Sequence, residues 1–282
     1  MLLKGKDAAD KIVSELLEEN LDGLTLAVFH PLNDGAAESY LKTKEKWLKK
    51  INAKIEVVPV DEKMTHDKFF RRLEQLNKDA SITGIMVELP LPIKIPEKEL
   101  LTGINPLKDV DAITYFNQGK IFTSKNEDLI PCTSAASIKL LEHYRIDFSG
   151  KNALIIGRSY IVGLPLFKLF LNRNATPTVA HRGTLNLKDL IHNADIIAVC
   201  AGTRGIVKSS EVKDGAVVAD VGIHVTEEGK VVGDMIIDGE NEENRINYSP
   251  VPGGVGTVTN AMMLHNLLQC RKLQLQNQAE CK

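Results

Sequence analysis

A single carboxylate stands at the end of an otherwise apolar run in GIMVELPLP (84–92). The residues before Glu88 are typical of a buried strand, whereas a buried carboxylate is costly unless it is paired or reached by water. Two further polar residues, Tyr40 and Lys44, lie four positions apart in ESYLKTKEKWLKK and would share one face of a helix. From spacing alone, that segment is more typical of an amphipathic surface helix than of a site.

Two other segments have compositions suited to ligand binding. DVDAI supplies Asp109 and Asp111 after a turn, and PVPGGVGTVTN (250–260) sets two adjacent glycines beside two prolines. The second composition suits neither a strand nor a helix, but it suits a backbone that closes over a ligand.

A glycine-containing turn in IIGRSYIVGLP follows an apolar strand that ends at Gly157, and a helix opens near Gly163. Backbone N–H groups of such a turn can face a pyrophosphate. The spacing is not G-x-G-x-x-G, so a nucleotide site and a plain tight turn are equally supported. Downstream, VAHRGT offers Arg182 and no acid, which with Arg158 would suit the 2′-phosphate of NADP. A solvated loop arginine is the equal alternative.

These residues must be positioned by an alternation of strand and helix patterns. Strands are expected at 25–30, 55–60, 84–89 and 152–157, and in TPTVAH, DIIAVCAG and GAVVADVGI. Helices are expected at 8–17, 36–50, 68–76, 163–171 and 258–273, before a polar, frayed tail. The repeating βα pattern predicts two α/β lobes with parallel sheets and a cleft between the lobes.

The composition favours small-molecule chemistry. The chain has 282 residues, 43% of them hydrophobic, and its 35 basic and 37 acidic residues create no field that would recruit nucleic acid or a membrane. Charged residues interrupt the N-terminus and no apolar run approaches membrane-spanning length, so we expect a cytoplasmic protein. The four cysteines are far apart without C-x-x-C, so neither a disulfide framework nor a metal site is expected.

Six blocks together carry a resemblance: SYLKTKEK, GIMVELPLP, NPLKDVDAI, PCTSAAS, GRSYIVGLP and PVPGGVGTVT, in this order. From about Leu3 to Leu273, the chain resembles the bifunctional methylenetetrahydrofolate dehydrogenase/cyclohydrolase family. The resemblance implies a folate-binding catalytic domain over 1–120, completed by a helix at 260–282, and a Rossmann-like NAD(P)-binding domain over 121–259. It implies oxidation of 5,10-methylenetetrahydrofolate with NADP, with NAD the less expected cofactor. Hydrolysis of the methenyl product to 10-formyltetrahydrofolate follows, in a homodimer.

The resemblance also implies roles for individual residues. Lys44 would be the general acid/base with Glu88 as its partner, Tyr40 would stack on the aminobenzoyl ring, and Asp111 would bind the pterin. The other folate-lining residues would be Pro90, Pro252, Gly253 and Gly254. The cofactor would be bound by Gly157, Arg158, Ser159, Ile161, Gly163, Arg182 and Ile223.

Several positions depart from the family pattern. Glu88 replaces glutamine, and the remaining departures are Ala112 for glycine, Ser134 and Ala136 in PCTSAAS, and Thr257 for proline. Because a carboxylate favours charged lysine, we hypothesise that dehydrogenase activity persists while cyclohydrolase activity is reduced. Two alternatives stay open: a shikimate-dehydrogenase-like oxidoreductase, which leaves PVPGGVG unexplained, and a non-catalytic folate- or nucleotide-binding paralogue.

Overall fold

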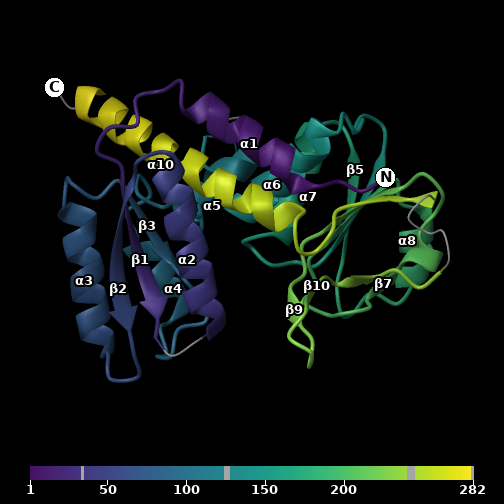
Figure 1. Ribbon diagram of the computed structural model, residues 1–282, viewed down its shortest axis with the longest axis horizontal. Helices are drawn as coiled ribbons and strands as arrows, with labels where there is room; N and C mark the ends of the chain where they lie inside the picture. The colour runs from purple at the N-terminus through teal and green to yellow at the C-terminus, as the bar shows by residue number, and fades with distance from the viewer. Residues whose placement is uncertain (33–34, 124–127, 240–244, 281–282) are drawn as a thin grey trace. The chain divides into compact units, whose positions relative to one another are not determined.

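The computed structural model describes residues 1–282 apart from 33–34, 124–127, 240–244 and 281–282. Helices and parallel strands alternate along the chain, which confirms the predicted α/β class (Figure 1). The chain forms two compact units, each assembled from separate stretches of sequence. Unit 1 comprises 1–11 and 133–262, and unit 2 comprises 12–132 and 263–282.

Unit 2 is built on a three-stranded parallel sheet in the order β2-β1-β3. Its strands are β1 (Thr25–Pro31), β2 (Lys54–Val60) and β3 (Gly84–Val87), flanked by the helices α2 (Gly35–Lys50) and α3 (His66–Lys78) (Figure 1). The central strand β1 is buried because neighbours cover it, and Phe29 stacks against Phe69 of α3 with ring centroids 4.4 Å apart. The expected third strand ran to residue 89, but β3 ends at Val87, so Glu88 lies just beyond it.

A segment after β3 extends this sheet without forming a full strand. Ile85 bridges Asp109 in parallel, and the Ile85 amide donates to the Lys108 carbonyl at 2.6 Å. Of the four described helices that the sequence patterns did not predict (α4, α5, and α6 and α8 of residues 132–143 and 187–193), α4 (Glu97–Gly103) and α5 (Tyr115–Thr123) lie on either side of this segment in the chain. The bridge brings residues 109–111 alongside β3.

The C-terminal helix is longer than expected. α10 spans Val255–Glu280, so the prediction of a frayed tail after residue 273 was wrong for the described residues. The Gln274 side-chain amide donates to the carbonyls of Thr83 (2.7 Å) and Leu107 (3.0 Å), which anchors this end of α10. At the other end of the chain, α1 (Gly5–Leu16) stops before Leu17, which is exposed rather than part of the buried stripe.

Unit 1 contains a five-stranded parallel sheet in the order β12-β8-β6-β4-β5. Its strands are β4 (Asn152–Ile156), β5 (Thr176–Ala180), β6 (Ile196–Val199), β8 (Val217–Asp220) and β12 (Asn247–Tyr248). Its helices include most of α6 (Cys132–His143), α7 (Gly163–Asn172) and α8 (Leu187–Asn193), and η1 (Ser209–Glu211) is a single turn. Two short pairs complete it: β7 (Val207–Lys208) with β11 (Met235–Ile236), and β9 (His224–Val225) with β10 (Val231–Val232).

Both sheets have a topological switch point, which is where ligands bind in open α/β sheets. In unit 1 the chain moves from β4 outward to β5 and returns to β6 on the other side of β4. In unit 2 it moves from β1 to β2 and returns to β3 on the other side of β1. None of the described helices is long and apolar enough to cross a membrane.

Candidate active site

The carboxylate of Glu88 lies at the switch point of unit 2. Strand register pairs Phe29 with Val87, so the next residues, His30 and Glu88, are neighbours where β1 and β3 end. Glu88 Oε1 accepts a hydrogen bond from Lys44 Nζ at 2.5 Å. The two side chains are 10% and 15% exposed, so this is a largely buried ion pair. The charge of Lys44 therefore compensates the carboxylate at the end of this apolar run.

Lys44 and Tyr40 share one face of α2, as their spacing predicted. Lys44 Nζ lies 5.9 Å from the centroid of the Tyr40 ring, within the range of a cation–π contact. The Tyr40 ring is itself exposed, so it is open to a planar ligand.

His30 is a site residue that the sequence reasoning missed. Its ring is 1% exposed, and Nδ1 lies 2.5 Å from Glu88 Oε2, so each oxygen of Glu88 has its own partner. Its other nitrogen, Nε2, lies 3.4 Å from Glu38 Oε1 on α2. A polar residue at the end of the apolar TLAVFH run was a usable signal, because parallel strands bring their carboxyl ends to one edge.

Asp109 and Asp111 have different surroundings although only one residue separates them. Asp109 is fully buried and accepts hydrogen bonds from the amides of Ile113 (3.1 Å) and Thr114 (2.8 Å) and from Asn117 Nδ2 (2.9 Å). Burial raises the pKa of the Asp109 carboxyl against these donors. Asp109 therefore has a structural role, because its carboxylate holds the turn that leads into α5.

Asp111 is half-buried and belongs with the Lys44 group. Burial raises the pKa of Asp111 to about 6, the Lys44 charge opposes that rise, and the charges of Asp109 and Glu88 add to it. The preceding residue is fixed by Asn266 of α10, whose amide donates to the Val110 carbonyl at 2.8 Å. Unit 2 thus brings Tyr40, Lys44, Glu88 and Asp111 into one region.

Ala112, which follows Asp111, has a left-handed backbone. Its φ is +51° and its side chain is buried, a conformation that costs a non-glycine residue about 1 kcal/mol or more. The departure from glycine therefore falls where glycine is favoured. Ala136, in contrast, is buried within α6, where alanine is a better helix former than glycine.

The glycine-rich turn lies at the switch point of unit 1. A Cβ on Gly157, whose φ is +136°, would lie 2.4 Å from the Cys200 carbonyl oxygen at the end of β6. A Cβ on Gly163, the first residue of α7, would lie 2.2 Å from the Gly157 carbonyl oxygen. Only glycines let β4, the turn and α7 approach this closely.

The other predicted cofactor residues lie at the carboxyl ends of the unit 1 strands. Arg158, Ser159 and Ile161 are exposed in the turn, Arg182 is exposed directly after β5, and Ile223 is exposed after β8. Gly157 N–H donates to the Ala180 carbonyl at 2.9 Å, which brings the ends of β4 and β5 together. No acid occurs in the HRGT segment after β5, so the exposed surface there is basic.

Ser134 makes a contact that was not predicted. The sequence suggested a helix cap, but Ser134 lies inside α6, and its hydroxyl donates to the carbonyls of Val162 (3.0 Å) and Ile161 (3.2 Å). It therefore ties α6 to the turn before α7. Nothing in the structure explains the threonine at 257, whose amide donates to the Gly254 carbonyl in the first turn of α10.

The remaining predicted folate residues are divided between the units. Pro90 follows Glu88 in unit 2, whereas Pro252, Gly253 and Gly254 lie in unit 1 directly before α10. The Gly253 carbonyl accepts a hydrogen bond from the Gly5 amide at 2.7 Å, which fixes the start of this loop.

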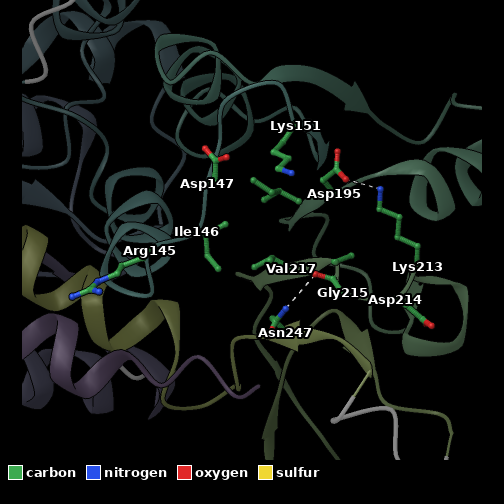
Figure 2. Close-up of a pocket in the computed structure, with 12 residues that line it drawn as sticks. Arg145, Ile146, Asp147, Lys151, Asp195, Lys213, Asp214, Gly215, Val217 and Asn247 are labelled. Atoms are coloured by element: carbon green, nitrogen blue, oxygen red, sulfur yellow. Dashed lines mark hydrogen bonds and ion pairs between the residues drawn. The ribbon is translucent and has the colours of Figure 1, made fainter.

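A separate cavity of about 300 Å³ lies at the amino ends of the unit 1 strands, opposite the glycine-rich turn (Figure 2). Its lining includes residues at the amino ends of β6, β8 and β12, and Figure 2 shows Asp195 paired with Lys213 beside it. None of the predicted site residues lines this cavity.

Comparisons with known proteins identify the family of the chain. Residues 3–111 match the model of the tetrahydrofolate dehydrogenase/cyclohydrolase catalytic domain, and residues 131–275 match that family's NAD(P)-binding domain. The chain belongs to the tetrahydrofolate dehydrogenase/cyclohydrolase family. The bifunctional protein FolD of Staphylococcus saprophyticus is 40% identical over 280 residues, which cover 97% of each chain.

Solved structures of the family show the same fold. The bifunctional enzyme FolD of Campylobacter jejuni matches with a TM-score of 0.91 at 38% identity, over 97% of this chain and 99% of that one. The Trypanosoma brucei dehydrogenase-cyclohydrolase, solved with NADP and an inhibitor, matches with a TM-score of 0.88 at 30% identity over 98% of each chain. Shikimate 5-dehydrogenase of Thermus thermophilus, at 12% identity and a TM-score of 0.53, shares the fold alone. Family membership therefore favours folate chemistry over the shikimate alternative.

Proposed function

We propose that this protein oxidises 5,10-methylenetetrahydrofolate with NADP and hydrolyses the methenyl product to 10-formyltetrahydrofolate. The strongest support is the 2.5 Å contact between Lys44 and Glu88, close to Asp111, in a chain that matches both domain models of the family. Residues 1–120 with helix 260–282 would form the folate-binding catalytic domain, and residues 121–259 the NAD(P)-binding domain.

Different residues would bind the aminobenzoyl group and the pterin of the folate. The exposed Tyr40 ring offers a stacking surface for the aminobenzoyl group, and the two oxygens of Asp111 would accept hydrogen bonds from the aminopyrimidine edge of the pterin. Pro90 and the residues Pro252, Gly253 and Gly254 are further folate contacts that the family resemblance implies.

The carboxyl ends of the unit 1 strands are the proposed binding site for NADP. Its support is the close-packed strand-to-helix turn at Gly157 and Gly163, a type of turn that can bind a pyrophosphate, and the exposed Arg158 and Arg182 without a competing acid. NADP would supply the hydride acceptor. Ser159 would hold the turn, because its carbonyl accepts the Leu164 amide at 3.0 Å, and Ile161 and Ile223 would add apolar contacts.

The two reactions make different demands on Lys44. Hydride loss needs no strong base, because the folate nitrogens stabilise the forming cation, so positioning can supply much of the rate. Hydrolysis needs a group that moves protons, and Lys44 can take a proton only in its neutral form. Because Glu88 at 2.5 Å favours the charged lysine, we expect the cyclohydrolase to be the weaker activity.

Assembly and location complete the proposal. A homodimer is expected from the family resemblance, and light scattering of the purified protein measures it. A cytoplasmic location is supported by the described cysteines, which are free thiols at Cys132, Cys200 and Cys270.

A spectrophotometric assay with methylenetetrahydrofolate and each cofactor tests the reaction, following reduced nicotinamide and the methenyl product separately. Formation of NADPH with methylenetetrahydrofolate as the substrate supports the proposal. NADPH formation with shikimate alone, or folate binding without turnover, would refute it in favour of the corresponding alternative. Glu88→Gln is expected to raise the rate of methenyltetrahydrofolate hydrolysis and leave oxidation nearly unchanged. Unchanged hydrolysis in this variant would contradict the role given to Glu88.

A further inference from the structure

His30 lies between two carboxylates. Nδ1 lies 2.5 Å from Glu88 Oε2, and Nε2 lies 3.4 Å from Glu38 Oε1. A neutral imidazole has one donor nitrogen and one acceptor nitrogen, whereas an imidazolium has two donors. Ionised carboxylates only accept, so the imidazolium alone satisfies both contacts.

Burial strengthens these contacts at one end of the ring. His30 is 1% exposed and Glu88 is 10% exposed, so their interaction is poorly screened, while Glu38 is 46% exposed and its contact is weaker. Among the described residues, the titratable groups that face Glu88 are Lys44 from α2, His30 from β1 and, electrostatically, Asp111 from the segment after β3. One oxygen of Glu88 therefore contacts Lys44 and the other contacts His30, with the Asp111 carboxyl nearby.

We propose that His30 is a positioning residue that carries a proton at neutral pH and neutralises Glu88, so that Lys44 faces a pair with no net charge. The cancellation is partial, because Glu88 contacts Lys44 directly whereas His30 contacts the other oxygen of Glu88. His30 therefore limits how strongly Glu88 holds Lys44 in its protonated form, and sets the size of the cyclohydrolase deficit. This inference rests on the proposed function for its kinetic test.

A double-mutant cycle with His30→Gln and Glu88→Gln measures this effect. Glutamine at position 30 keeps an N–H donor and removes the charge, so the hydrogen bond and the charge are separated. We expect His30→Gln to lower the hydrolysis rate about tenfold, since a charge at this range changes a proton equilibrium by that order, and to change oxidation less than twofold. In the Glu88→Gln background the same change should leave hydrolysis within twofold.

The matched control is His66→Gln, which removes a histidine paired with Glu99 at 2.8 Å on the exposed surface of the same unit. It should change neither activity. Equal losses of oxidation and hydrolysis in His30→Gln, or the same loss in the Glu88→Gln background, would mean a merely structural role and would overturn the proposal.

Nitrogen NMR of the wild-type protein reads the proton directly and needs neither turnover nor a variant that folds. At pH 7 both ring nitrogens of His30 should have imidazolium shifts, and Glu88→Gln should move them toward the neutral ring. A neutral His30 ring in the wild type overturns the proposal. If the protein has no folate activity, the proposed function fails, and this NMR result still decides the protonation of His30.

Discussion

Replacing Asp109 by alanine should destabilise unit 2 strongly, although Asp109 is only two residues from the proposed substrate-binding Asp111. The change removes the acceptor of three buried donors: the amides of Ile113 and Thr114, and Asn117 Nδ2. A buried donor left without a partner costs about 1–3 kcal/mol, so we expect a loss of about 4 kcal/mol. That is a large fraction of the roughly 5–15 kcal/mol typical of a folded domain.

Urea unfolding at pH 7 measures this loss, and the chain contains its own probe. Trp47 is the single tryptophan of the sequence, is buried, and belongs to the same unit as Asp109. Asp109→Asn keeps one acceptor oxygen and should lose about 2 kcal/mol, since it still leaves donors unpaired.

The matched control for this series is Asp111→Asn, which should not lower the free energy of unfolding, because it removes a carboxylate whose burial is unfavourable. A loss below about 1 kcal/mol for Asp109→Ala, or a larger loss at Asp111 than at Asp109, would refute the division of roles between the two acids.

Four further outcomes are expected. Because the pKa of Asp111 is raised to about 6, its carboxylate gains a proton between pH 7 and 5. The KM for methylenetetrahydrofolate should therefore rise below about pH 6 in a steady-state pH profile, and Asp111→Asn should lack this rise. The same raised value means that its contribution to stability is fully present below about pH 4 and is lost as the pH rises through 6. Gly163→Ala should raise the KM for NADP about tenfold or more, because its Cβ would meet the Gly157 carbonyl at 2.2 Å. Gly119→Ala, in α5 with open space around it, should leave that KM unchanged, and equal effects of the two changes would contradict the account of the turn. Arg182→Ala should reduce the preference for NADP over NAD about tenfold, measured as the ratio of kcat/KM values, whereas the exposed Arg71→Ala should not.

Residue order and type were sufficient to predict the architecture. Apolar runs alternating with amphipathic stretches predicted most of the strands and longer helices, because burial selects those periods locally. The ordered motif blocks likewise predicted the family, since they span both matched domains. Errors fell where distant contacts overrule local composition. Gln274 looks like part of a polar tail, yet its amide reaches the carbonyls of Thr83 and Leu107 and keeps α10 helical.

The chemistry around Glu88 depended on tertiary structure. The sequence marked Glu88 as a costly carboxylate, and Lys44 came from the family resemblance, but His30 was hidden at the end of an apolar strand. It meets Glu88 because β1 and β3 are parallel neighbours in register, although the two residues are 58 positions apart in the sequence. The same applies to Asp109 and Asp111, which are equivalent in sequence and differ only because the fold surrounds one with three donors and leaves the other near Lys44. A charge takes its role from the groups that approach it in space, and chain order does not encode those groups locally.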